Sequence, residues 1–293
     1  MRQADVRTRP RAGVIASVRP RLRLVDTLRW AVLLLVAATV IVPIAFAALG
    51  GLRTTGELQN NPAALPSTWY PSNYIEVLTG DSFWGELGNS ILIAAISTTV
   101  LVAVTSLAAF VFARIAFRGR EALFTLFVLG LLFPSAVAIL PLYILIRGLG
   151  LLDNPLGVAL PLAAFQIPLT IVILRPFFRA IPVELEDAAR IDGCSTFGFF
   201  WRVLLPLSRP ALATVSVLAV VAAWNEFLLP LVVLSDQDQW TLPLGVMNFS
   251  TQYTTDIARV LAYTTLAMVP ALVFYVFAER QLVGGLTSGA VKG

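Results

Sequence analysis

Six long apolar stretches constrain the fold of this 293-residue chain more than any other feature. They run roughly over residues 30–49, 90–112, 122–146, 157–174, 210–234 and 257–278. About 20 apolar residues allow a helix to cross the hydrocarbon core of a bilayer. Only 13% of the residues are charged, against about 25% in soluble domains. We therefore predict an all-α membrane protein with six transmembrane helices.

Prolines lie inside or at the ends of these stretches, at Pro43, Pro134, Pro141, Pro161, Pro168, Pro230 and Pro270. A proline removes a backbone donor and bends a helix, which a membrane tolerates only where neighbours satisfy the freed carbonyl. One interpretation is a bent bundle whose helices break near mid-membrane. The other is that the prolines are unremarkable, because proline is common in transmembrane helices.

The basic residues predict the orientation of the chain. Residues 1–29 contain eight arginines, and the loops at 114–120 and 175–209 contain eight more, whereas residues 50–89 contain only Arg53. Arginine-rich loops stay in the cytoplasm. We predict that both termini and the loop at 175–209 are cytoplasmic, with the basic tail 1–27 touching anionic lipid headgroups.

The first apolar stretch has two interpretations. Ala45-Phe46-Ala47 resembles a signal-peptidase site, but the run is longer than the 7–15 residues that are typical of a signal peptide, so an uncleaved helix is favoured. We divide the chain into the tail 1–27, a six-helix domain at 28–280 and a C-terminal tail at 281–293.

The residue types argue against several kinds of chemistry. The chain contains no histidine and one cysteine, Cys194. This argues against a protein-ligated metal site and excludes both an intrachain disulfide and histidine acid–base catalysis. The net charge of +4 is no sign of nucleic-acid binding, because the basic residues gather at one end and in alternate loops. We predict no catalytic residue, no metal ligand and no cofactor.

One polar loop, residues 182–206, interrupts the apolar pattern. Pro182 and the acidic residues after it favour the start of a short helix, and Gly193 can take the positive φ that ends one. Ser195 or Thr196 can cap a second helix that runs to about Leu205. Pro206 is predicted to stop this helix, and Phe199, Phe200 and Trp201 to give it an apolar face at the bilayer boundary. The alternative is an interfacial hairpin with no partner.

The spacing in this loop resembles the signature of ABC importer permeases, in which Glu-Ala-Ala is followed by a Gly and then by Ile-x-Leu-Pro. The corresponding residues here are Asp187-Ala188-Ala189, Gly193 and Val203-Leu204-Leu205-Pro206. Asp187 is shorter than the usual Glu, and the neighbouring Glu186 can substitute for it. The resemblance implies a type I ABC importer permease fold in which loop 182–206 carries a cytoplasmic coupling helix.

Permeases of this kind lie in the prokaryotic plasma membrane and work with a second, MalF-like permease subunit. They also work with two ATPase subunits that bind ATP and Mg²⁺, and with an extracytoplasmic sugar-binding protein. The resemblance implies coupling to an ATPase through Glu186, Asp187, Ala188, Ala189, Asp192, Gly193, Leu205 and Pro206. The chain contains no Gly-x-x-x-x-Gly-Lys-Ser/Thr phosphate loop, which agrees with ATP hydrolysis by a partner.

The C-terminal segment, residues 281–293, resembles the tail of the MalG-type permeases of carbohydrate importers. Trp69-Tyr70-Pro71 and Trp224-Asn225-Glu226-Phe227 extend the agreement, which covers all but residues 1–25. It implies that Gly284, Gly285 and Gly289 leave the tail flexible enough to lie along the ATPase. The alternative for this tail is plain disorder.

Glu226 is the only ionisable residue deep inside an apolar stretch. Such a carboxylate is costly unless it faces a cavity or a partner. One hypothesis places Glu226, Asn225 and Trp224 on the translocation path, because they offer stacking and hydrogen bonds to a sugar. The rival is a structural role for Glu226. Gln166 and Tyr143 are weaker candidates.

The leading functional interpretation is the membrane subunit of an ATP-driven importer of di- or oligosaccharides or related sugars. An ABC permease for another solute, such as a glycerol-phosphate compound, is an alternative. An ion-coupled secondary carrier is a further one, although it usually shows paired repeats and none is detected. A membrane-embedded enzyme would need a catalytic pair within the spans, and the sequence shows none.

Overall fold

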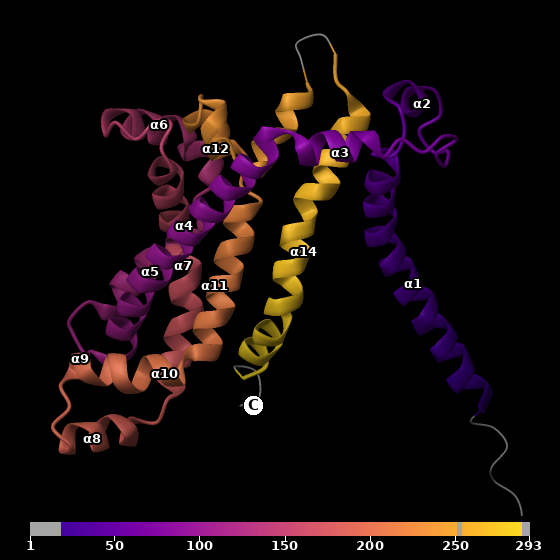
Figure 1. The fold of residues 1–293 in the computed structure, drawn as a ribbon. Coiled ribbons are helices and arrows are strands. Elements are labelled where there is room, and N and C mark those ends of the chain that lie inside the picture. The colour runs from indigo at the N-terminus through magenta and orange to yellow at the C-terminus, as the bar shows by residue number, and fades with distance from the viewer. Residues whose placement is uncertain (1–18, 251–253, 289–293) are drawn as a thin grey trace, which may run out of the picture.

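The computed structural model describes residues 19–250 and 254–288, which fold into helices joined by short loops (Figure 1). The long helices are α1 (Arg19–Gly50), α4 (Asp81–Arg114), α7 (Pro155–Ala180), α11 (Arg209–Trp224) and α14 (Ile257–Ser288). The shorter helices are α2 (Thr55–Asn60), α3 (Ser72–Thr79), α5 (Arg120–Leu129), α6 (Ile139–Gly148), α8 (Val183–Ile191), α9 (Thr196–Phe199), α10 (Leu205–Leu207), α12 (Leu228–Val233) and α13 (Leu242–Gly245). Strand pairing in the described ranges is limited to one isolated bridge, between Ser250 and Thr255. The all-α prediction is confirmed.

Four helical segments are each long and apolar enough to cross a membrane. They are Asp26–Gly50 of α1, all of α4, all of α7 and Ile257–Glu279 of α14. Two bent pairs also qualify if each is counted as one span: Arg120–Leu132 with Ser135–Gly148, bent by 88°, and Thr196–Leu207 with Arg209–Trp224, bent by 77°. The described residues therefore contain four to six candidate spans, in agreement with the predicted number.

The spans are broken at two places. The predicted fifth span, residues 210–234, is wrong as a single helix, because α11 ends at Trp224 and residues 225–227 separate it from α12. The third span is interrupted at Phe133 and Pro134, where the backbone is extended, as expected before and at a proline. Other prolines lie inside continuous helices, among them Pro43, Pro168 and Pro270. Each interpretation of the prolines is thus correct for some of them.

The predicted C-terminal tail, residues 281–293, begins as a continuation of α14. This helix runs through Gly284 and Gly285 to Ser288. Gly289 lies outside the described residues, as do residues 1–18 of the predicted basic tail.

The core is formed by α4, which packs along α7, and by α11, which packs against both (Figure 1). We call the end of the bundle that carries α2 and α3 the upper end, and the end that carries α8 to α10 the lower end. One buried cluster, including Ile93 and Val158, lies toward the upper end. Another, including Phe110 and Phe178, lies toward the lower end. These clusters hold the three helices together over their whole length.

Helix α1 leans away from this core and meets α14 near the upper end (Figure 1). None of the residues in its most apolar 18-residue window is buried. The contact with α14 depends on a close approach at Gly51, where a Cβ atom would lie 2.8 Å from the Cα of Ala262. The remaining face of α1 is open to lipid or to another protein.

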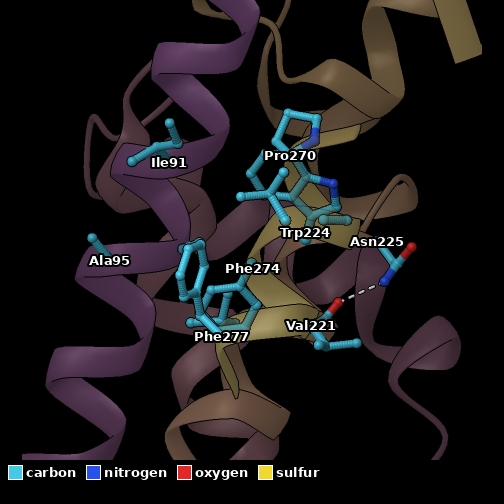
Figure 2. A pocket seen from close by; sticks show the side chains of 12 residues that line it. Ile91, Ala95, Val221, Trp224, Asn225, Pro270, Phe274 and Phe277 are labelled. Atoms are coloured by element: carbon cyan, nitrogen blue, oxygen red, sulfur yellow. Dashed lines mark hydrogen bonds between the residues drawn. The ribbon is translucent and has the colours of Figure 1, made fainter. Parts of the chain in front are cut away.

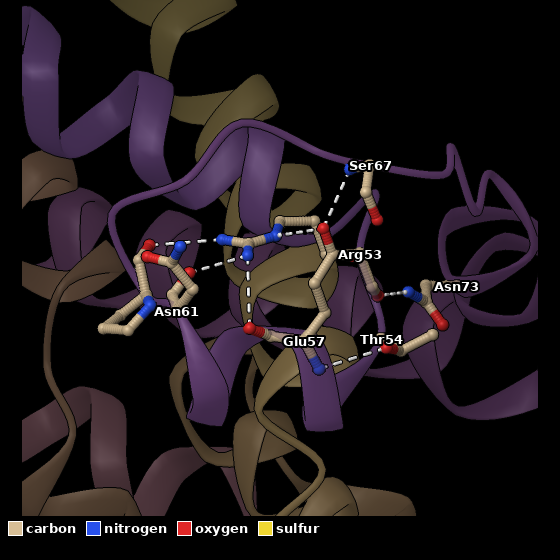
Figure 3. A network of polar contacts seen from close by, with 7 residues as sticks. Arg53, Thr54, Glu57, Asn61, Ser67 and Asn73 are labelled. Atoms are coloured by element: carbon tan, nitrogen blue, oxygen red, sulfur yellow. Dashed lines mark hydrogen bonds and ion pairs between the residues drawn. The ribbon is translucent and has the colours of Figure 1, made fainter.

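At the upper end, residues 53–71 form a folded loop, which we call the strap. Arg53 is only 1% exposed and closes the strap from inside (Figure 3). Its guanidinium donates to the carbonyl oxygen of Asn61 at 2.7 Å and to those of Pro62 and Glu57 at 3.2 Å. Its Nε lies 3.3 Å from Glu57 Oε1, which also accepts the Ser67 N–H at 2.8 Å. One arginine thus binds three backbone carbonyls of the strap.

The stability of the strap should depend on the charge of Glu57. The Ser67 backbone N–H, with further help from the Ser67 side chain and Arg53, holds the pKa of Glu57 below its usual 4.5. A lowered folded-state pKa adds stability that is complete above the unfolded pKa and is lost as the pH falls through the folded one. We expect the Ser67 amide to lose hydrogen-exchange protection, corrected for intrinsic rate, as the pH falls below 4.5.

The matched control is Glu57→Gln, which carries no charge at any pH. Its Ser67 amide should show weaker protection at neutral pH and no such loss on acidification. Equal acid sensitivity in both proteins would contradict the role assigned to Glu57.

Candidate functional site

The polar loop at the lower end has the helix–bend–helix shape that the sequence predicts. α8 ends in a turn at Gly193, whose φ is +79°. The Cys194 N–H donates to the Ala189 carbonyl at 2.8 Å and the Gly193 N–H to that of Arg190 at 3.0 Å, so the last carbonyls of α8 are satisfied. Ser195 caps the next helix, because its Oγ accepts the Gly198 N–H at 3.1 Å. The predicted roles of Gly193 and Ser195 are confirmed.

Both ends of the loop differ in detail from the prediction. Pro182 precedes α8 as its cap and is not the first helical residue. Pro206 does not stop the second helix, which continues as far as Leu207 and bends by 77° before Arg209. The helix accommodates this proline through a π-helical segment, Phe200–Leu204, in which the Leu205 N–H reaches back to the Phe200 carbonyl. Such π segments occur mostly as single turns and often at functional sites.

The aromatic residues of this second helix do not all face the bilayer boundary. Phe199 and Phe200 are each 1% exposed and pack in the lower cluster, whose members come from α4, α7 and α11. Of the three residues predicted to form the apolar face, only Trp201 is exposed, and it lies beside Phe197, a further exposed aromatic residue of this helix. The predicted apolar surface face is therefore wrong for the two phenylalanines, which anchor the loop to the core.

The predicted coupling residues divide into an inner and an outer set. Glu186 is the only buried residue of α8. Its Oε1 accepts from Arg190 Nη2 at 2.6 Å, and its Oε2 lies 3.8 Å from Arg114 Nη1 at the end of α4. Exposed to solvent are Asp187, Ala188, Asp192, Gly193 and Pro206, whereas Ala189 and Leu205 are partly buried.

This division corrects one expectation. Glu186 cannot substitute for the shorter Asp187, because the two carboxylates lie on different sides of α8, one buried against Arg114 and one in solvent. The surface that α8 offers to a partner is therefore centred on Asp187 and Ala188. The sequence signal that was overlooked is Arg114, which closes a long apolar stretch and needs a counter-ion.

A second candidate site is a cavity of about 520 Å³ between α4, α11 and α14 (Figure 2). Its lining is mostly apolar and aromatic, and includes Trp224, Phe274 and Phe277. Asn225 is the one amide among the lining residues, and its Nδ2 donates to the Val221 carbonyl at 2.7 Å. Its side-chain oxygen is left to accept a further bond. Gln166 and Tyr143 are not among the residues that line this cavity.

Glu226 lies apart from Trp224 and Asn225. Its Oε1 accepts the Leu229 N–H at 3.1 Å, which caps α12 after the break in the span. It lines a separate cavity of about 80 Å³ together with Ser135 and Phe165. The three residues that were predicted as one cluster are thus split between two cavities.

The family model for binding-protein-dependent transport system inner membrane components matches residues 104–281, a region that includes the polar loop, α11 and most of α14. The chain belongs to this family. Its match to the model begins within α4 and takes in the whole helix–bend–helix loop, the smaller cavity and the α11 and α14 sides of the larger one.

Relatives of this family member align over nearly the whole chain. A putative ABC transporter permease protein of Caldicellulosiruptor is 37% identical over 92% of this chain and 98% of the relative. The trehalose transport system permease protein SugB of Mycobacterium tuberculosis is 36% identical over 90% of this chain and 97% of its own length. A solved chain from a bacterial ABC transporter that imports the acidic polysaccharide alginate superposes with a TM-score of 0.78 at 21% identity. The superposition covers 91% of this chain and 99% of the solved chain. The importer-permease fold is confirmed.

Replacing Gly193 should destabilise the permease through its backbone alone. A Cβ atom would meet nothing within 4 Å there, but φ is +79°. We expect Gly193→Ala to lower the free energy of unfolding by about 1–2 kcal/mol and Gly193→Asn to lower it less, because Asn tolerates this conformation. Gly85→Ala, at an equally open position in α4, should cost nothing. Thermal unfolding of the purified proteins measures the difference, and equal effects at the two glycines would contradict it.

Glu226 should act through the N–H that it accepts. Glu226→Gln retains the accepting oxygen, so we expect thermal stability and transport to be unchanged. Glu226→Ala leaves the Leu229 N–H without its partner and should cost about 1 kcal/mol, as for other lost helix caps. Loss of transport with normal stability in Glu226→Gln would instead return Glu226 to the translocation path.

Proposed function

We propose that this chain is the membrane-spanning permease subunit of an ATP-driven carbohydrate importer. The family membership supports transport, and the relative named for trehalose and the fold-related alginate importer support a sugar or oligosaccharide as substrate. The observation that carries the proposal is the polar loop, because α8 presents exposed Asp187 and Ala188 next to the Gly193 turn at one end of the bundle.

In this proposal α8 is the coupling helix. The lower end faces the cytoplasm, in line with the arginine-rich loops. There, each of two ATPase subunits, with ATP and Mg²⁺ bound, binds one permease subunit. Asp187, Ala188, Ala189, Asp192 and Gly193 supply the docking surface. The small side chains of the two alanines do not protrude from this surface, so that the backbone of a partner can approach α8 closely. The permease itself hydrolyses nothing.

The upper end faces outward and receives sugar from an extracytoplasmic binding protein. A second, MalF-like permease completes the transport path. The exposed apolar face of α1 supports such pairing, since none of the residues in its most apolar window is buried within this chain. Gly284 and Gly285 lie near the end of α14, and in this proposal the segment that carries them and Gly289 contacts the ATPase.

Trp224 and Asn225 are the residues that we assign to the translocation path. They line the larger cavity, where an aromatic ring offers stacking and an amide offers hydrogen bonds to sugar hydroxyls. Glu226 is assigned a structural role, because it caps α12.

A permease for a non-sugar solute, such as a glycerol-phosphate compound, is the runner-up. Within the described residues, the larger cavity is lined without any arginine or lysine, and a phosphate ester would need such a cation. The uncharged cavity therefore favours a neutral sugar. An ion-coupled carrier is disfavoured, because Glu226 is used to cap a helix.

The test is co-purification with the ATPase subunit of the same transport system. Ala188→Trp places a large ring on the exposed face of α8 and should reduce ATPase recovery at least about tenfold, a loss of about 1.4 kcal/mol in binding. Thermal unfolding of the permease should not change. Asp187→Glu, which keeps the carboxylate, should leave ATPase recovery unchanged.

The matched control is Ala63→Trp, which makes the same change at an exposed position of the strap. It should leave ATPase recovery at its normal level. Full recovery with Ala188→Trp, or transport by the chain without any ATPase, would contradict the proposed function.

A further inference from the structure

Helix α8 is held to the rest of the protein by a buried charge. Glu186 is its only buried residue, and the apolar side chains of Val183, Leu185 and Ile191 are 54%, 41% and 86% exposed. The counter-charges are unequal: Arg114 is 7% exposed and Arg190 is 58% exposed. Of the two ion pairs that Glu186 makes, the one with Arg114 is therefore the buried one.

Arg114 in turn binds α7. It is the last residue of α4, and its Nη2 donates to the carbonyl oxygens of Phe178, at 2.7 Å, and Ile181, at the end of α7. One guanidinium thus joins α4, α7 and α8. The fork-like geometry of arginine allows this, whereas a lysine offers a single point charge.

A second buried arginine fixes α7 to its neighbours on the same level. Arg175 Nε donates to the Phe112 carbonyl of α4 at 3.2 Å, and its Nη2 pairs with Glu121 of α5. Its guanidinium also lies 3.9 Å from the ring centre of Phe124. The lower ends of α4, α5 and α7 therefore form one body, to which Arg114 attaches α8.

The other route out of α8 is irregular. It passes through the Gly193 turn, the π-helical segment Phe200–Leu204 and the 77° bend before α11. Separating Glu186 from Arg114 would leave the buried Arg114 guanidinium without a carboxylate and with only the α7 carbonyls as acceptors, which is unfavourable.

We infer that Arg114 and Glu186 are positioning residues that make α8 move as one body with α4 and α7. A displacement of α8 by the ATPase then reaches α4 and α7 directly through the ion pair, and it reaches α11 through the bend and through the packing of α11 on these two helices. This inference rests on the proposed coupling role of α8, and it concerns force transmission by a buried contact, not the docking surface itself.

The experiment uses the reconstituted complex of the permease with its partner subunits. Glu186→Ala should leave ATPase co-purification and ATP hydrolysis intact, while substrate transported per ATP falls about tenfold, within the usual range of coupling between sites. Glu186→Gln and Arg114→Lys, which keep part of the contact, should give smaller losses and guard against misfolding. Glu184→Gln, on an exposed side chain of the same helix, should behave as the unmodified chain.

A distance measurement tests the rigid-body motion itself. Spin labels at exposed Val111 of α4 and Ile191 of α8, in a Cys194→Ser background, should report one distance with and without ATP. In Glu186→Ala the distance should change with ATP.

Three results would overturn the inference. Unchanged transport per ATP in Glu186→Ala would show that the pair transmits nothing, as would a label distance that already changes with ATP in the unmodified chain. Loss of the ATPase from Glu186→Ala alone would place Glu186 in the docking surface. Failure of the unmodified chain to bind any ATPase is distinguishable from all of these and would remove the proposed function together with the inference.

Discussion

The need to satisfy every backbone polar group inside an apolar environment underlies this structure. Helices meet the need by themselves, which is why the apolar stretches are helical. Where a helix ends or breaks, a side chain supplies the missing partner. Glu226 accepts the Leu229 N–H after the break in the fifth stretch, and Arg114 donates to two carbonyls where α7 ends. Arg53 does the same for the strap.

These polar contacts also divide the molecule into parts with different tasks. The packing of α4, α7 and α11 gives a stable body. At its lower end, the loop is anchored by buried aromatic residues on the α9 side and by one ion pair on the α8 side. Helix α8 exposes most of its surface, and its one buried side chain is paired with Arg114 of α4. It is therefore suited to transmit a displacement imposed by a partner to the rest of the bundle.

Much of the candidate site could be predicted from the sequence, because it depends on local chemistry. Gly193 was expected to take a positive φ and Ser195 to cap the following helix, and both do so. Each feature involves residues within a few positions of one another. The direction of Glu186 was not predictable in this way, because its partner Arg114 is 72 residues earlier in the chain. The burial of Phe199 and Phe200 was missed for the same reason, since it depends on α4, α7 and α11.

The sequence by itself determined the helical class, the approximate places of the spans, the helix–bend–helix loop and the family. These follow from run length, turn chemistry and motif spacing, which are local properties of the chain. Only the tertiary structure decided which spans are broken, that Pro206 follows a π-helical segment without ending the helix, and that Glu226 is separated from Trp224 and Asn225. It also decided that Glu186 faces inward and Asp187 outward. The reason is physical: whether a proline, a carboxylate or an aromatic ring is tolerated depends on what the neighbouring helices provide, and those neighbours are distant in the sequence.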